Sequence, residues 1–245
     1  MRKEDIILNT IVFKEALDKG IKQVDLLDSI KTLGLRRVEI RREFLGDITS
    51  DLLLLKAKAD ELDVELFYSI NEDFVLDHKI HPNLQLFCQE AALIGAPFIK
   101  LNVGDASRIS LSELEEWHKQ LDTGIGIRLE NNQDPQFASI SNCQLMMAKC
   151  QKANLPISFV FDTGNWAWVG ENVFEALDAL KDVSTYIHCK NYHKQEDEVM
   201  LTSLFAGDLD MLGLMNMFSD VEYIAFEYPA SVDIIKKDLE KFCGG

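Results

Sequence analysis

Short runs of β-branched and aromatic residues recur along the chain at intervals of roughly thirty residues, the size of one strand-and-helix unit. Between them lie stretches in which apolar residues follow helical spacing. Strands that alternate with helices are typical of a parallel sheet. The eight predicted strands centre on Ile7–Val12, Arg37–Arg41, Val64–Ser69, Phe98–Val103, Gly126–Glu130, Ile157–Asp162, Thr185–Lys190 and Tyr223–Glu227.

Helices are predicted between the strands, and punctuation residues support several of their ends. Ser110 followed by Glu113 fits a capping box at the start of a helix. Gly20, Gly34 and Gly95 stand where helices are expected to end. The predicted helical stretches are Val24–Leu33, Leu52–Leu62, Leu84–Ile94, Leu111–Leu121, Ile140–Ala153, Val173–Leu180, Met211–Phe218 and Val232–Phe242.

The number of units favours one closed architecture. Eight strand-and-helix units within 245 residues fit an α/β fold, a single (β/α)8 TIM barrel spanning residues 1–245. An open, doubly wound sheet is the alternative. No G-x-G-x-x-G follows the first strand, which weakens a dinucleotide-binding version of that alternative.

The predicted strands alternate between apolar and polar positions instead of being apolar throughout. In the second strand, Val38 and Ile40 fall on one face, and Glu39 and Arg41 fall on the other. Because the apolar face must pack on the helices, we expect the polar face to line the barrel interior. Charges there must neutralise one another or hold an ion or ligand. A solvated face on a two-layer sheet is the structural alternative.

Composition narrows the functional classes. The formal net charge of −16 repels phosphate backbones, so we expect no nucleic-acid partner. The five cysteines include no CxxC pair, which argues against a zinc knuckle or a disulfide framework and favours reduced thiols in the cytoplasm. The residues 1–5 lack a signal-peptide pattern, and no apolar run has membrane-spanning length, so no membrane association is expected.

Four polar residues end consecutive predicted strands and carry the candidate chemistry. They are Glu130, Asp162, His188 and Glu227. The carboxyl ends of barrel strands meet at one rim, so these side chains should surround one point. Three carboxylates and an imidazole suit one divalent ion, Mn²⁺, Mg²⁺, Co²⁺ or Zn²⁺. Each residue alone has an ordinary alternative, such as a turn cap, a core histidine or an ion pair with Arg128 or Arg41.

The strand ends also resemble a known superfamily. Residues 129–132, 161–165, 187–191 and 226–228 read L-E-N-N, F-D-T-G-N, I-H-C-K-N and F-E-Y. They are similar to the strand ends of the xylose isomerase-like barrels, which include sugar-phosphate isomerases/epimerases, ketose 3-epimerases, hydroxypyruvate isomerases and inosose dehydratases. The G-D-L-D run at 207–210 is also similar to the Gly-Asp stretch that precedes the seventh main helix in that family.

The resemblance implies roles for particular residues. Glu130, Asp162, His188 and Glu227 match the family's metal ligands, and Glu130 and Glu227 match its pair of proton-transferring carboxylates. Lys190 matches a lysine that often follows the ligand histidine. Many relatives have histidine where Asn165 stands and aspartate where Asn191 stands. The first difference also argues against the three-zinc endonuclease IV branch.

These observations predict a metal-dependent isomerase or epimerase of a small sugar or hydroxy-carbonyl compound, acting by proton transfer through a metal-stabilised enediolate. A dehydratase of a keto-polyol on the same scaffold is the first alternative, and a non-catalytic sugar-binding barrel is the second. No Gly-rich phosphate cradle stands out, which favours an unphosphorylated substrate. A homo-oligomer is possible.

Other residues receive supporting roles as hypotheses. Lys100, Asn165, Trp166 and Lys190 are expected to contact substrate, and Trp166 with Trp168 either forms an apolar wall or packs in the core. Glu39 is expected to orient His188 or hold Arg41, and Arg128 to tune the carboxylates or balance charge. The polar segment 191–206 is expected to be a long loop that acts as a lid or merely covers the surface.

Overall fold

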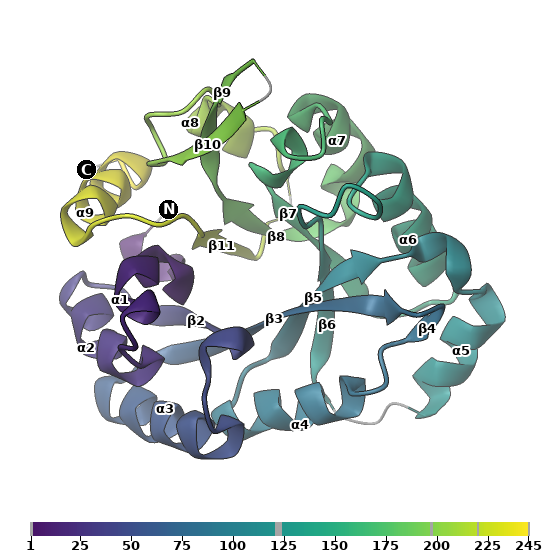
Figure 1. Cartoon of the computed structure of the whole chain (residues 1–245), viewed down its shortest axis with the longest axis horizontal. Helices are drawn as coiled ribbons and strands as arrows, with labels where there is room; N and C mark the ends of the chain where they lie inside the picture. The colour runs from purple at the N-terminus through teal and green to yellow at the C-terminus, as the bar shows by residue number, and fades with distance from the viewer. Residues whose placement is uncertain (1, 121–123, 197, 220, 245) are drawn as a thin grey trace.

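Eight parallel strands close into a barrel in the computed structural model, which describes residues 2–120, 124–196, 198–219 and 221–244. Around the barrel the order is β2, β1, β11, β8, β7, β6, β5 and β3, and a pairing of β3 with β2 closes the ring (Figure 1). The predicted (β/α)8 architecture is confirmed. The strands are β1 (Ile6–Asn9), β2 (Arg37–Arg41), β3 (Glu65–Leu76), β5 (Phe98–Gly104), β6 (Gly126–Glu130), β7 (Ile157–Asp162), β8 (Ser184–Cys189) and β11 (Tyr223–Phe226).

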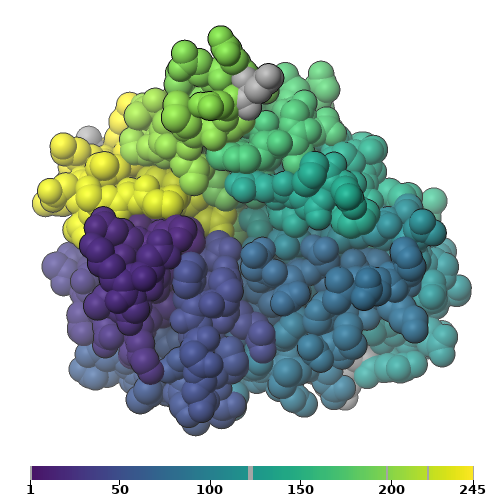
Figure 2. Space-filling model, in the orientation of Figure 1, coloured from purple at the N-terminus to yellow at the C-terminus, as the bar shows by residue number. Residues whose placement is uncertain are grey.

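Helices surround the barrel (Figure 1). Because β1 pairs with β11, the first and last segments of the chain lie side by side, purple and yellow in Figure 2. Each predicted helical stretch contains a helix, although residue 121 lies outside the described residues. The helices are α1 (Lys14–Asp18), α2 (Gln23–Thr32), α3 (Ile48–Leu62), α4 (Leu84–Ile94), α5 (Leu111–Gln120), α6 (Ile140–Lys152), α7 (Val173–Leu180), α8 (Met211–Met215) and α9 (Val232–Phe242).

Local side chains explain where several helices begin and end. The capping box before α5 is confirmed: the Ser110 amide donates to Glu113, and the Glu113 amide donates to the Ser110 hydroxyl. Ser139 and Ser231 are simple N-caps of α6 and α9, whose side chains accept from the Asn142 and Ile234 amides. Helix α4 ends at Gly95, whose φ of 71° is a left-handed conformation that glycine adopts without a Cβ clash.

The interior of the barrel has two layers, and the sequence anticipated only the polar one. Val38 and Ile40 pack outward against the helices, as the alternation predicts. The inward positions nearer the amino ends of the strands form a buried apolar cluster of their own. The polar positions gather toward the carboxyl ends. The apolar interior cluster contains Ile7, Phe67, Phe98, Val160, Tyr186 and Ala225.

Three segments differ from the predicted elements. The first strand stops at Asn9, because the Asn9 side chain accepts a hydrogen bond from the Ile11 amide and starts a 3-10 turn over Thr10–Phe13. Strand β3 continues to Leu76 and pairs with the short antiparallel strand β4 (Lys79–Ile80). The expected long loop at 191–206 contains an antiparallel hairpin of β9 (Asn191–Gln195) and β10 (Glu198–Thr202).

Within the part of the chain that the structure describes, none of the helices has the length and apolar character needed to cross a bilayer.

Candidate metal centre and substrate pocket

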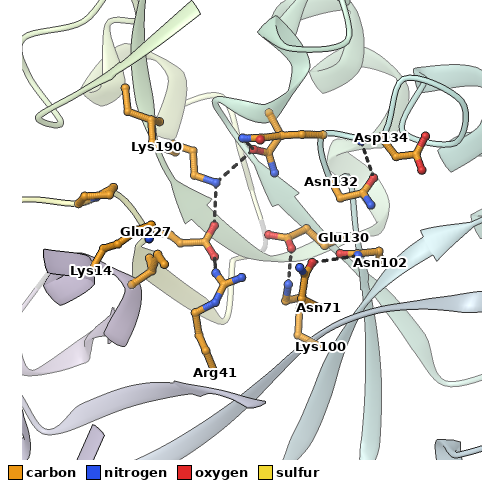
Figure 3. A pocket seen from close by; sticks show the side chains of 15 residues that line it. Lys14, Arg41, Asn71, Lys100, Asn102, Glu130, Asn132, Asp134, Lys190 and Glu227 are labelled. Carbon is orange, nitrogen blue, oxygen red and sulfur yellow. Dashed lines mark hydrogen bonds and ion pairs between the residues drawn. The ribbon is translucent and has the colours of Figure 1, made fainter. Parts of the chain in front are cut away.

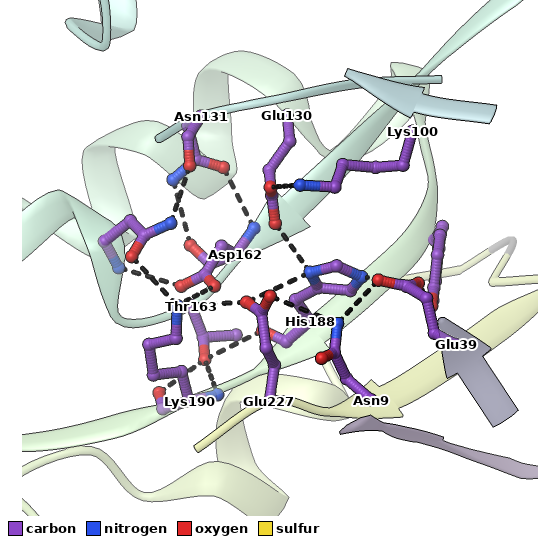
Figure 4. Close-up of polar contacts among 12 residues, drawn as sticks. Asn9, Glu39, Lys100, Glu130, Asn131, Asp162, Thr163, His188, Lys190 and Glu227 are labelled. Carbon is purple, nitrogen blue, oxygen red and sulfur yellow. Dashed lines mark hydrogen bonds and ion pairs between the residues drawn. The ribbon is translucent and has the colours of Figure 1, made fainter. Parts of the chain in front are cut away.

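The structure gathers the four strand-end residues around one point (Figure 4). Glu130 and Asp162 end β6 and β7, His188 lies near the end of β8, and Glu227 follows β11. One ligand atom from each lies within 4.8 Å of those of the others, and all four side chains are buried. The register puts Asp162 beside His188, whereas Glu130 pairs with Val160 and Glu227 lies two residues beyond Ala225, the partner of His188. All four side chains point inward at the carboxyl ends of their strands.

The donor set fits a divalent cation. His188 Nδ1 lies 2.6 Å from Glu130 Oε1 and 3.2 Å from Glu227 Oε2. Glu130 Oε1 and Asp162 Oδ2 are buried and accept no hydrogen bond of normal geometry from the described residues, although Lys190 Nζ is 2.8 Å from Asp162 Oδ2. Convergent carboxylate oxygens and one imidazole nitrogen are ligands that Mn²⁺, Co²⁺, Zn²⁺ and Mg²⁺ accept.

Glu39 orients the histidine ring. Its Oε2 lies 3.2 Å from His188 Nε2, so in the neutral, metal-binding form of the ring this nitrogen would carry the proton, while Nδ1 faces the cluster. Tyr186 donates its hydroxyl to Glu39, and Asn9 donates to the other oxygen at 2.7 Å. A carboxylate behind the histidine is the arrangement that fixes a metal-binding imidazole.

Three basic side chains neutralise the carboxylates. Lys100 Nζ lies 2.5 Å from Glu130 Oε2, and Arg41 and Lys190 lie 2.5 and 3.0 Å from the oxygens of Glu227. Burial opposes ionisation of Glu130, but Lys100 and His188 outweigh it and lower its pKa to about 2. The pKa of Glu227 also falls well below its usual value, because Lys190, His188 and Arg41 outweigh burial.

Asp162 and His188 shift in the opposite direction. Burial raises the pKa of Asp162 to about 7, although Lys190 counteracts it. Burial alone would lower the pKa of His188, but Glu39, Glu130 and Glu227 raise it well above its usual value. The cluster therefore holds protons that a bound cation would displace.

A tight turn after β7 brings Lys190 into the cluster. Asp162 Oδ1 accepts hydrogen bonds from the Gly164 and Asn165 amides, both at 2.8 Å. A Cβ at Gly164 would lie 2.9 Å from the Lys190 side chain, so glycine leaves the room that this lysine occupies. The Asn165 side-chain oxygen then accepts from Lys190 Nζ at 3.1 Å.

A cavity of about 380 Å³ opens above the cluster, within the size range of small-ligand pockets (Figure 3). Glu130 and Glu227 line it, as do three of the predicted substrate contacts, Lys100, Asn165 and Lys190. Sequence reasoning missed several further lining residues on the strand ends. Asn102 and Arg41 had a signal, since each holds the last inward position of its predicted strand. The others include Asn71, Asn132, Gln133 and Asp134.

Two predicted site residues lie elsewhere. Trp166 is 1% exposed and packs against Phe161, with ring centroids 5.5 Å apart, so it belongs to the outer core and forms no wall of the cavity. Arg128 points to the amino ends of the strands, where its guanidinium stacks over Phe98 and donates to Glu222. Because Arg128 pairs with Glu222 at that end and contacts none of the ligand carboxylates, the expectation that it tunes them is wrong, and the alternative of charge balance remains.

Asn191 has a structural role that its departure from the family pattern did not indicate. Its side chain donates to the carbonyls of Leu204 and Leu209 and accepts from the Tyr192 and Leu209 amides. A Cβ at Gly207 would lie 2.3 Å from the Asn191 side-chain oxygen, so glycine is required for this contact. The asparagine thus fixes the β9–β10 hairpin to the loop before α8.

Comparisons with known proteins agree with the fold. No family model and no curated protein matches this chain. A xylose isomerase domain containing protein from Salmonella typhimurium LT2 has a TM-score of 0.72 at 14% identity, over 100% of this chain and 97% of that chain. The IolI protein, solved with a binding zinc atom, has a TM-score of 0.73 at 14% identity, over 98% of each chain.

A third similar structure is the 3-keto-D-glucoside 4-epimerase YcjR from E. coli, with a TM-score of 0.66 at 12% identity, over 98% of this chain and 99% of that chain. At such identities the likeness is one of fold. The matches nevertheless extend over nearly the whole of each chain, as the strand-end motifs led us to expect. The chain therefore has the fold of the xylose isomerase-like TIM barrels.

Proposed function

We propose that this protein is a divalent-metal-dependent isomerase or epimerase of a small sugar or hydroxy-carbonyl compound. The observation that carries the proposal is the pair Glu130 and Glu227, which face one another across the floor of the cavity (Figure 3). Each is within 3.2 Å of the same histidine nitrogen, so both carboxylates border one prospective reaction centre. The sugar epimerase among the similar structures lends support through its fold.

Glu130, Asp162, His188 and Glu227 would hold the cation. When bound, a divalent cation supplies Lewis acidity that makes the C–H beside a carbonyl acidic and stabilises the enediolate. One of Glu130 and Glu227 removes that proton, and the other returns a proton to the opposite face or to the adjacent carbon. Lys100 beside Glu130, and Arg41 and Lys190 beside Glu227, favour the ionised form of both carboxylates, which is the form that accepts a proton.

The surrounding side chains have roles in positioning. Lys100 and Lys190 reach the cavity from β5 and from the residue after β8, and each is held by a carboxylate of the cluster. Lys100 can donate to a substrate oxygen without leaving Glu130, because an ammonium has three donors. Lys190 already faces Asp162, Glu227 and Asn165, so it would exchange the Asn165 oxygen for a substrate oxygen. Asn165 lines the same wall beside Lys190.

Isotope exchange tests the proposal. The purified chain is loaded with Mn²⁺ and incubated in D₂O with unphosphorylated ketoses, and deuterium at the carbon beside the carbonyl is measured by mass spectrometry. We expect incorporation without loss of water, abolished in Glu130→Gln and Glu227→Gln and retained in the exposed control Glu175→Gln. Metal analysis of the same variants reports ligand loss separately.

Other outcomes select the alternatives. Release of water with each deuterium would identify a dehydratase. Retained metal with no proton exchange on any sugar would contradict an enzymatic role and favour a sugar-binding barrel.

A further inference from the structure

One side of the cavity carries three amides. Asn71 on β3, Asn102 on β5 and Asn132 after β6 line it together with Lys100 and Asp134, whereas Lys190 lies on the far side (Figure 3). Asn102 pairs with Glu130 in the register of β5 and β6, so their backbones are about 5 Å apart. When the reacting carbon of a substrate lies at Glu130, the polar groups on the neighbouring carbons of that substrate therefore lie close to Asn102.

Asn102 has an unused acceptor. The residue is 4% exposed, and its Nδ2 donates to Asn71 Oδ1 at 3.3 Å. Its Oδ1 is buried and accepts no hydrogen bond from the described residues. A buried carbonyl without a donor is costly, and the ligand group that best satisfies it is a hydroxyl, which donates here and accepts elsewhere.

The cations of the cavity are already paired. Among the described residues that line it, Lys100 and Lys190 face carboxylates of the cluster, and Arg41 lies between Glu43 and Glu227. Lys14 at the rim is paired with Asp18 at 2.7 Å. A phosphate on the amide side would find neutral amides and the carboxylate of Asp134 instead of an unpaired basic side chain.

We propose that Asn102, held by Asn71, is a specificity-determining residue that binds a hydroxyl of a neutral polyhydroxy carbonyl substrate, and that this amide side rejects the phosphorylated form. The inference rests on the proposed function, since it describes the substrate of the same site.

Direct binding measurements test this inference apart from catalysis. Isothermal titration calorimetry with Mn²⁺-loaded protein compares D-fructose, D-tagatose and D-xylulose with fructose 6-phosphate. We expect one or more neutral ketoses to bind at least about tenfold more tightly than the phosphate. Asn102→Leu, which keeps the size but loses the amide, should weaken that ketose by about three- to tenfold, the effect of one neutral hydrogen bond.

Controls separate recognition from folding and chemistry. Asn216→Leu, at an exposed helix end, should leave binding unchanged. Asn71→Ala changes an exposed position, so it folds more safely than the buried variant and should weaken the same ketose to a smaller extent. In deuterium exchange, Asn102→Leu should raise KM and leave kcat within about twofold, because the amide does not touch the transferred proton.

The outcomes distinguish the two proposals. Equal or tighter binding of the phosphate, unchanged binding in Asn102→Leu, or binding of no ketose would overturn the role of the amides. Tight, Asn102-dependent ketose binding without any proton exchange would refute the isomerase and leave the substrate class standing.

Discussion

The buried ion pair of Lys100 and Glu130 offers a quantitative test of the charge balance in the barrel. Lys100 is 1% exposed, and its Nζ lies 2.5 Å from Glu130 Oε2. Replacing one partner of a buried pair leaves an uncompensated charge, at a cost of about 3–5 kcal/mol. His188 also faces Glu130 and takes up part of the charge, so we expect Lys100→Met to cost about 3 kcal/mol.

That loss corresponds to a fall in Tm of about 6 °C for a chain of 245 residues. The assay is denaturant and thermal unfolding in the presence of a chelator, so that metal binding does not contribute. Because Lys100→Met/Glu130→Gln removes both charges, its loss of stability should be smaller than the sum of the two single losses by about 2 kcal/mol.

A surface pair provides the matched control. Lys56 and Asp60 form an exposed i,i+4 pair on α3, and their cycle with Lys56→Met and Asp60→Asn should give a coupling of only about 0.3–0.5 kcal/mol. If the losses at Lys100 and Glu130 are additive, with a coupling energy no larger than that of the control pair, the reasoning that this buried pair is energetically coupled is refuted.

Three further predictions concern residues outside the metal cluster. Arg128→Met should lose about 1–2 kcal/mol of stability, because the stacking of the guanidinium on Phe98 is lost. The Mn²⁺ affinity measured by calorimetry should stay within twofold, and a tenfold loss of that affinity would place Arg128 in the metal site. Asn191→Asp should lose about 2 kcal/mol or more of stability, because the carbonyls of Leu204 and Leu209 lose their donor. Limited proteolysis within 191–209 should accelerate, and an unchanged cleavage rate would contradict the role of Asn191 in fixing the hairpin. Trp166→Ala should cost about 3–5 kcal/mol in unfolding experiments with an unchanged ketose KM, whereas a raised KM in folded protein would return Trp166 to the cavity.

The sequence predicted the architecture and the candidate cluster because both depend on local periodicity. A period of two along each strand assigns side chains to a face, and the topology of a parallel barrel brings all carboxyl ends to one rim. Glu130, Asp162 and His188 therefore come together without any knowledge of long-range contacts, and the structure has their ligand atoms within 4.8 Å of one another.

Periodicity could not decide where a long side chain ends. Lys100 and Arg128 are partners in the register of β5 and β6 and share the interior face, yet Lys100 reaches Glu130 and Arg128 reaches Glu222 at the other end of the barrel. The flexible aliphatic part of a lysine or arginine side chain can extend toward either end of the barrel, and the position of the nearest carboxylate determines which end its charge reaches. That choice depends on the sequence-distant segment before β11, which only the folded chain brings close.

The same limit applies to the residues after a strand. Trp166 follows the Asp162 turn in sequence, but the turn directs its ring outward to Phe161, while Asn165 faces the cavity. Asn102 held an inward position from the start, yet its unused acceptor follows from its contacts with the neighbouring strand β3. The sequence by itself determined the strands, their polar face and the group of strand-end acids. Tertiary packing decided which charges pair and which amides remain open to a ligand, because those depend on distances between segments far apart in the chain.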